Sequence, residues 1–104
     1  MYGRLVEIEG LDPSRVEEAL QNIRENVIPA LKEIDGFAGF ISLMDEENRR
    51  GRSVVLWETR EGAEEADRLM APRREEMVRQ LGATVRSTDL YEARIVEVQT
   101  GVRA

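Results

Sequence analysis

The chain has 104 residues, 41% of them apolar, and this length suits one domain over residues 1–104, small enough to favour pairing with a copy of itself. Its formal net charge of −6 argues against a nucleic-acid partner, because phosphate binding requires a face with an excess of lysine and arginine. The absence of cysteine excludes a disulfide framework, and the N-terminal sequence has no apolar run typical of a signal peptide or membrane span, so we expect a cytoplasmic protein without a membrane partner.

Residues 2–9 are predicted to form the first strand. Their side chains alternate, with Arg4, Val6 and Ile8 on one face. Both faces combine apolar and polar residues, so the alternation alone does not say which face is buried.

A helix is predicted to follow Asp12, which suits an N-cap and precedes Pro13, a residue tolerated at the first helical position. Pro29 lies within this helix, where a proline loses a backbone hydrogen bond and clashes with the preceding turn. We therefore predict a kink or break near Asn26 and Val27. The helix carries one apolar stripe, formed by Val16, Leu20, Ile23, Val27, Leu31 and Ile34.

Two further strands are predicted as a hairpin, over residues 36–44 and 53–59, joined by a polar turn over residues 45–52. Both strands are apolar on both faces. A strand pair of this kind needs cover on each side of the sheet. Trp57, the only tryptophan, lies in the second of these strands.

The second helix is predicted to begin at about Arg60, with an interruption at Ala71–Pro72 and an end at Gly82. A final strand is predicted over residues 90–98, followed by a polar, loosely held tail over residues 99–104. The order is βαββαβ, which places helices on one face of the sheet only. A second copy of the chain is the simplest cover for the other face, so a homodimer is expected.

The segment from Pro29 to Asp67 resembles the antibiotic-biosynthesis-monooxygenase-like (ABM-like) family of dimeric α+β barrels. The resemblance covers nearly the whole chain and rests on the Gly36-Phe37 strand start and on the strand-to-helix junction Val55-Leu56-Trp57-Glu58-Thr59-Arg60-Glu61. It implies an α+β, ferredoxin-like fold, with an antiparallel four-stranded sheet, two helices on one face, and two sheets facing each other in a homodimer. The family includes cofactor-independent monooxygenases, heme-degrading oxygenases and small proteins without known activity.

The branches of this family differ in residues that can be checked here. The heme-degrading branch adds a strand asparagine and a helical histidine, whereas this chain has Arg4 at the first position and no histidine, so it lacks that heme ligand. In the phenol-oxidising branch, Trp57 matches a pocket tryptophan and Ser53 stands where that branch has an asparagine. Arg73 and Arg74 are the candidates for its helical arginine.

Five residues are therefore candidates for ligand binding: Trp57, Arg4, Ser53, Arg73 and Arg74. A large ring at a strand end can form the wall of an aromatic pocket or can belong to the core. Arg4 is predicted on the same face as Trp57, where its guanidinium can hold a phenolate or carboxylate ligand or pair with a nearby glutamate.

No catalytic residue is assigned. Without histidine or cysteine, a general acid or base would be a tyrosine or a carboxylate of raised pKa. We expect no metal and no cofactor, since the acidic turn after Met44 lacks the spacing of a calcium loop. Two functions stay open: binding of an aromatic or other small apolar molecule with oxidation that needs no cofactor, and a non-catalytic binding or structural dimer.

Overall fold

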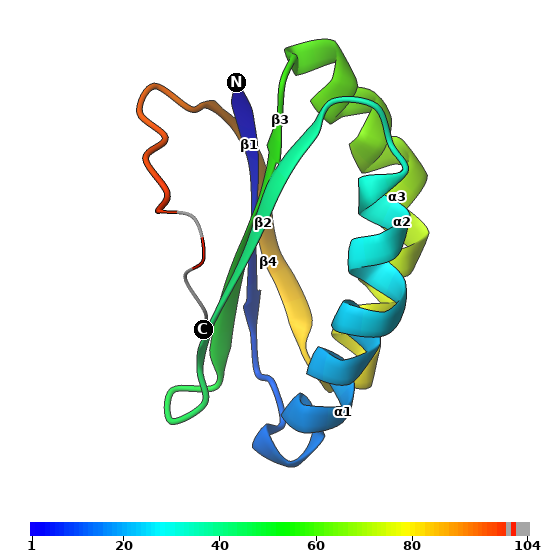
Figure 1. Ribbon diagram of the computed structural model, residues 1–104. Coiled ribbons are helices and arrows are strands. Elements are labelled where there is room, and N and C mark those ends of the chain that lie inside the picture. The colour runs from blue at the N-terminus through cyan, green and yellow to red at the C-terminus, as the bar shows by residue number, and fades with distance from the viewer. Residues whose placement is uncertain (100, 102–104) are drawn as a thin grey trace.

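The computed structural model describes residues 1–99 and 101. The four strands form one antiparallel sheet in the order β2-β3-β1-β4, and the helices lie on one face of it (Figure 1). The predicted α+β, ferredoxin-like fold is confirmed. None of the helices in the described residues is long and apolar enough to cross a membrane. The elements are β1 (Tyr2–Glu9), the 3₁₀ turn η1 (Pro13–Arg15), α1 (Val16–Asn22), the π-helical turn η2 (Ile23–Val27), α2 (Ile28–Lys32), β2 (Phe37–Asp45), β3 (Arg50–Trp57), α3 (Arg60–Gln80) and β4 (Thr84–Glu92).

The two central strands place Arg4 and Trp57 on the same face of the sheet. Tyr2 of β1 pairs with Trp57 of β3, and Arg4 pairs with Val55. Residues two apart in a strand share a face, and so do directly paired residues of neighbouring strands. The side chains of both pairs therefore lie on one side of the sheet. Val6 lies on this face and is buried, which identifies it as the face covered by the helices. The predicted sharing of a face by Arg4 and Trp57 is confirmed.

The irregularity predicted for the first helix is present as the π turn η2 between α1 and α2. Pro29 has no N–H to donate to the carbonyl four residues earlier, and its ring crowds that turn. The helix widens here, and the N–H of Ile28 donates to the carbonyl of Ile23, five residues back. The disturbance expected near Asn26 and Val27 is thus confirmed in position, although the chain stays helical through it.

The second helix, α3, begins where expected but continues through its proline. Its N-cap is Thr59, whose hydroxyl accepts a hydrogen bond of 3.0 Å from the N–H of Gly62. The interruption predicted at Ala71–Pro72 is wrong, because α3 is unbroken over 21 residues. Pro72 lies inside this helix and is exposed. The helix ends just before Gly82, whose φ of +70° favours glycine.

The last strand lies earlier in the chain than residues 90–98, so that prediction is wrong. β4 pairs with the whole of β1, and Glu92 lies opposite Tyr2 at the start of β1. Within the part of the chain that the structure describes, residues after Glu92 have no further strand to pair with, although the N–H of Ala93 donates to the carbonyl of Met1 at 2.8 Å. β4 is largely polar from Thr84 to Asp89, so it lacks the apolar alternation by which strands are recognised.

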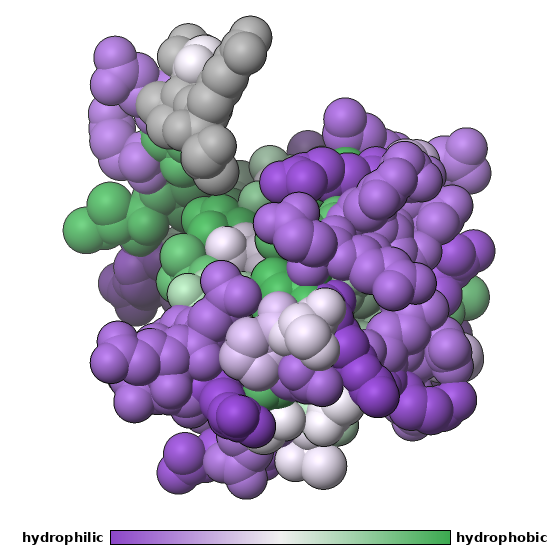
Figure 2. Space-filling view, turned by 90° about the horizontal axis from the view of Figure 1, so that it is seen from below, coloured by the Kyte–Doolittle hydropathy of each residue, from purple (hydrophilic) through white to green (hydrophobic). Residues whose placement is uncertain are grey.

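The second face of the sheet is uncovered and carries apolar side chains. Ile41 and Leu43 of β2 and Tyr91 of β4 lie on this face and are about half exposed. After β4 the chain runs along this side of the sheet, away from the helices (Figure 1), and Ile95 there is 90% exposed. Figure 2 shows hydrophobic groups gathered on the side away from the helices. Residues 100 and 102–104, in the tail expected to be loosely held, lie outside the described residues.

The core between the sheet and the helices is divided into two clusters. Trp57 is 2% exposed and meets Phe37 edge-to-face, with the ring centroids 5.8 Å apart and the planes at 74°. This geometry is favourable beyond the burial of area. The only tryptophan is therefore a core residue. The first cluster consists of Leu11, Val16, Ala19 and Leu81, and the second of Leu31, Trp57, Ala63 and Ala66.

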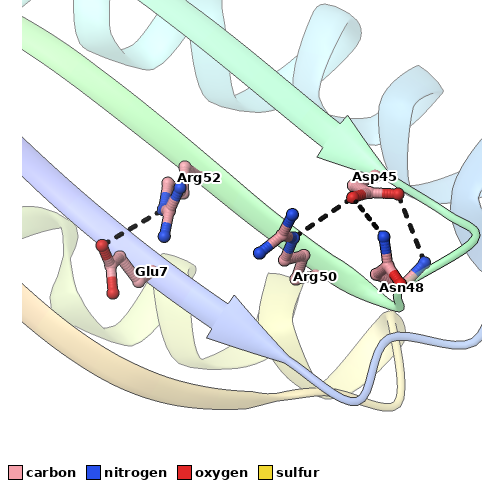
Figure 3. A network of polar contacts seen from close by, with 5 residues as sticks. All are labelled: Glu7, Asp45, Asn48, Arg50 and Arg52. Carbon is pink, nitrogen blue, oxygen red and sulfur yellow. Dashed lines mark hydrogen bonds and ion pairs between the residues drawn. The ribbon is translucent and has the colours of Figure 1, made fainter.

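A polar network holds the turn between β2 and β3 (Figure 3). The Asp45 carboxylate accepts hydrogen bonds from the N–H and the side-chain amide of Asn48, at 3.2 and 2.8 Å, and lies 3.2 Å from Nε of Arg50. Nearby, Nε of Arg52 lies 3.1 Å from the Glu7 carboxylate. The hydrogen bonds from Asn48, followed by the Arg50 guanidinium, hold the pKa of Asp45 below its ordinary value.

This network makes part of the stability of the hairpin depend on pH. Because the pKa of Asp45 is lower in the folded chain than in the unfolded chain, its contribution is present above the ordinary aspartate value of about 4 and is lost as the pH falls through the folded value. We predict that Asp45→Asn is less stable than the wild type at pH 7 and that the difference shrinks towards pH 2. Urea unfolding at several pH values checks this. Asn48→Ala should show the same trend, and a difference that stays constant with pH would contradict it.

The burial of Trp57 generates a prediction about stability. Trp57→Phe removes part of a close-packed ring and should lower the free energy of unfolding by about 2 kcal/mol. Leu69→Ala is the control, because Leu69 is exposed on α3 and its loss should change stability by about 0.5 kcal/mol or less. Chemical denaturation measures both. If Trp57→Phe unfolded like the wild type while its affinity for aromatic ligands changed, Trp57 would be a ligand contact and not a core residue.

Candidate functional site

A cavity of about 130 Å³ lies between the sheet and the helices. Residues of β1, β2 and β3 form its floor, and residues of η2, α2 and α3 form its roof. Valine, isoleucine, leucine, phenylalanine and methionine side chains make up most of the wall. The polar residues that line it are Arg4, Ser42, Arg52, Ser53, Arg73 and Arg74.

Small side chains in the sheet leave room for this cavity. Ser42 of β2 and Ser53 of β3 are direct partners in the register, and both line the cavity. Beside them, Gly51 lies opposite Ile8, and a Cβ atom on Gly51 would come within 3.1 Å of Cγ1 of Ile8. Large residues at the serine positions would fill the space between the sheet and the helices. The cavity therefore follows from serine and glycine at the centre of an otherwise apolar hairpin.

The cavity lies between the two clusters of the core. Leu81 of the first cluster and Leu31 of the second both line it. Ile23 and Val27, the first and last residues of the π turn, line it as well. π turns occur frequently at functional sites, because they displace side chains from the positions that a regular helix would give them. The turn that Pro29 disturbs is thus part of the cavity roof.

Arg4 brings a positive charge to the cavity from the central strand β1. Its side chain is 14% exposed, and its Nε atom lies 3.5 Å from Oδ1 of Asp67 on α3. This contact is an ion pair without hydrogen-bond geometry, and the Nε atom has no hydrogen-bond partner among the described residues. A buried donor left without an acceptor is unfavourable by about 1–3 kcal/mol. Arg4 is therefore a partly satisfied cation.

Asp67 connects Arg4 to a second arginine of the wall. The Nη1 atom of Arg74 donates to the same Oδ1 atom at 2.6 Å, so one carboxylate oxygen serves two guanidinium groups. Arg73, next to Arg74, also lines the cavity and is exposed. Three guanidinium groups and one carboxylate leave this side of the cavity with an excess of positive charge.

The structure brings four of the five candidate residues together. Trp57 is not among the residues that line this cavity, although Phe40 and Val55 both pack against the Trp57 cluster and line the cavity. Trp57 thus lies one layer behind the wall, and a role for it in ligand binding stays a prediction. The four candidates that line the cavity are Arg4, Ser53, Arg73 and Arg74.

Two residues of the site, Asp67 and Ser42, are not singled out by the sequence patterns. A signal for Asp67 is its spacing of seven residues from Arg74, which places both charges on one side of α3, two turns apart. A signal for Ser42 is its place between Phe40 and Met44, where strand alternation puts it on the same face as two large apolar residues. In both cases a polar residue occupies a position that the apolar pattern assigns to the core.

The wall is suited to binding more than to acid–base catalysis. Among the described residues that line it there is no carboxylate, imidazole or thiol, and guanidinium groups stay protonated in proteins. Asp12 lies in a turn outside the wall, where the hydroxyl and N–H of Ser14 lower its pKa. The described part of the chain also contains no cluster of three or more His, Cys, Asp or Glu side chains able to hold a metal ion. The wall can bind and orient an electron-rich or anionic molecule.

Comparison with known proteins identifies relatives in sequence that are uncharacterized. No protein-family model matches the chain. Uncharacterized proteins of two Mycobacterium tuberculosis strains, CDC 1551 and H37Rv, are 35% identical to it over 75 residues. The match covers 72% of this chain and 31% of each relative, so the chain spans about a third of the length of the curated proteins it matches.

Solved structures resemble the chain over nearly its whole length. A monooxygenase of Streptomyces coelicolor, in complex with the ligand nanaomycin D, has a TM-score of 0.70 at 15% identity, covering 95% of this chain and 92% of that one. SnoaB of Streptomyces nogalater, a cofactor-independent oxygenase, has a TM-score of 0.63 at 14% identity, covering 91% and 94%. A dimeric ferredoxin-like protein from an uncultured marine organism has a TM-score of 0.66 at 10% identity, covering 95% and 100%. The chain therefore has the ferredoxin-like α+β fold of the ABM-like proteins, as the sequence resemblance implied.

Proposed function

We propose that this chain binds a small aromatic or other apolar molecule in the cavity between its sheet and its helices. The observation that carries the proposal is the cavity itself, which has a volume of about 130 Å³, a mostly apolar wall and arginine side chains at one side. Ligand sites in proteins combine apolar walls with a few placed polar groups in this way. The ligand complex of the Streptomyces coelicolor monooxygenase, which shares the fold, supports the proposal.

The binding unit in this proposal is a homodimer formed through the uncovered face of the sheet. That face exposes Ile41, Leu43 and Tyr91, and the segment after β4 adds the exposed Ile95. Soluble monomers rarely expose a contiguous apolar patch of this kind, whereas dimer interfaces bury one. The dimeric ferredoxin-like protein with the same fold supports this assembly.

The reaction we propose for this site is oxidation of the bound molecule without a cofactor. The described wall offers guanidinium groups but no side chain that takes up a proton near neutral pH. A protein of this kind binds and orients a substrate that activates oxygen itself. The shared fold of SnoaB, a cofactor-independent oxygenase, supports this reaction. The alternative is a dimer that binds without reaction, and oxygen consumption separates the two.

The binding proposal predicts that filling the cavity weakens ligand binding. Ser42→Leu places an isobutyl group on the floor and should weaken binding of phenols, quinones or fatty acids by about tenfold or more. Calorimetry with such a panel measures this, and Ser14→Leu is the exposed control. An oxygen electrode with hydroquinones then tests for oxidation. A wild-type protein that binds no member of the panel would refute the proposed function.

The assembly proposal predicts a dimer of twice the 11.9 kDa mass of one chain. Ile41→Lys places a charge on the uncovered face and should raise the dimer dissociation constant by about tenfold or more. Leu69→Lys is the control, because Leu69 is also exposed but lies on α3. Sedimentation equilibrium measures both variants. A wild-type protein that is monomeric at micromolar concentration would contradict this assembly.

A further inference from the structure

The volume of the cavity limits the size of the molecule that it can hold. An apolar protein cavity of about 150 Å³ accommodates benzene. The cavity here, at about 130 Å³, is of similar size. It therefore suits one aromatic ring, whereas a fused polycyclic molecule would extend beyond this volume.

The charge of the wall calls for an anionic group on that ring. Arg4 and Arg74 share the single Oδ1 atom of Asp67, so one negative charge faces two positive charges. The Nε atom of Arg4 is buried and has no hydrogen-bond partner among the described residues. Arg4 lines the cavity and its side chain is 14% exposed, so an acceptor oxygen on a bound molecule can approach its guanidinium group and neutralise the second positive charge. This neutralisation favours an anion over a neutral molecule of the same size.

The chemistry of the wall also distinguishes a carboxylate from a phenolate. A carboxylic acid is ionised at neutral pH without help, whereas a phenol with a pKa of about 10 must lose its proton to a base. The described wall residues include no such base. A carboxylate also matches the planar fork of a guanidinium group, which a single phenolate oxygen does not.

We infer that the ligand of this cavity is a one-ring aromatic carboxylate of the benzoate class, held by Arg4 and Arg74. The inference rests on the binding part of the proposed function, not on the oxidation, and names its ligand class. In this arrangement Asp67 is a positioning residue, which holds both guanidinium groups at the cavity and lowers their net charge. A single bound carboxylate then balances the charge of the two arginines and Asp67.

Isothermal titration of the wild-type protein at pH 7 with benzoate, benzyl alcohol and 2-naphthoate tests the inference. Benzyl alcohol matches benzoate in size but carries no charge, and 2-naphthoate matches it in charge but has a second ring. Benzoate should bind about tenfold or more tightly than either of them. Equal affinities for benzoate and benzyl alcohol would overturn the charge argument, and equal affinities for benzoate and 2-naphthoate would overturn the size argument.

Variants assign the effect to particular residues. Arg4→Met keeps an apolar stem. It should weaken the binding of benzoate by about tenfold and leave the affinity for benzyl alcohol unchanged. Arg74→Met should act in the same direction and provides a second test should Arg4→Met fail to fold. Asp67→Asn keeps a side-chain oxygen that can accept from Arg74 but removes the competing negative charge, so it should strengthen benzoate binding. Arg86→Met is the matched control, since Arg86 is exposed on β4 and does not line the cavity. Unchanged benzoate affinity in both arginine variants would overturn the inference.

The outcomes also separate this inference from the proposed function. If benzyl alcohol or the neutral members of the ligand panel bind and benzoate does not, the ligand class is wrong and the binding function stands. If none of these molecules binds, the binding function itself is wrong, and the inference falls with it.

Discussion

The ion pair between Arg4 and Asp67 joins α3 to the central strand of the sheet. Arg4 lies on the helix-facing side of the central strand, in line with the buried Val6, where a charge cannot be covered by apolar side chains alone. Asp67 of α3 supplies the carboxylate, and Arg74, two turns further along the same helix, also contacts it. The core is divided into two clusters around this point, with the cavity between them. The ion pair of Arg4 and Asp67 and the cavity therefore lie at the same place between the sheet and α3.

Local sequence signals, such as helix caps and prolines, predicted most of the fold, because each of them affects the backbone next to it. Asp12 begins its helix by accepting a backbone hydrogen bond, as predicted, and the second helix begins at Arg60 as expected. Pro29 disturbs its helix where expected, whereas Pro72 does not end α3. Both prolines are exposed, so the exposure of the ring does not distinguish the two cases. β4 was missed because its position is set by pairing with β1, not by its own pattern.

The site was predictable only in part, because a cavity is a property of distant segments packed together. Arg4 was recognised as a charge on a central strand, and the structure confirms the face assigned to it. Whether Trp57 forms wall or core depends on where the sheet leaves room. That room lies above Ser42 and Ser53, toward the hairpin turn, and the ring of Trp57 lies at the other end of the strand against Phe37. No spacing within the strand itself distinguishes these two positions.

Because of the composition of the wall, a change in binding affinity with pH above neutrality reflects a change in the charge of the ligand. The charged groups among the described wall residues are guanidinium groups, which keep their charge across the accessible pH range. A neutral ligand would then bind equally from neutral pH to about pH 10. A carboxylate would also keep its affinity over this range, whereas a phenol would gain affinity on approaching pH 10. The change in affinity between neutral pH and about pH 10 thus distinguishes a phenol from a carboxylate, because the described wall residues offer no group that changes charge there.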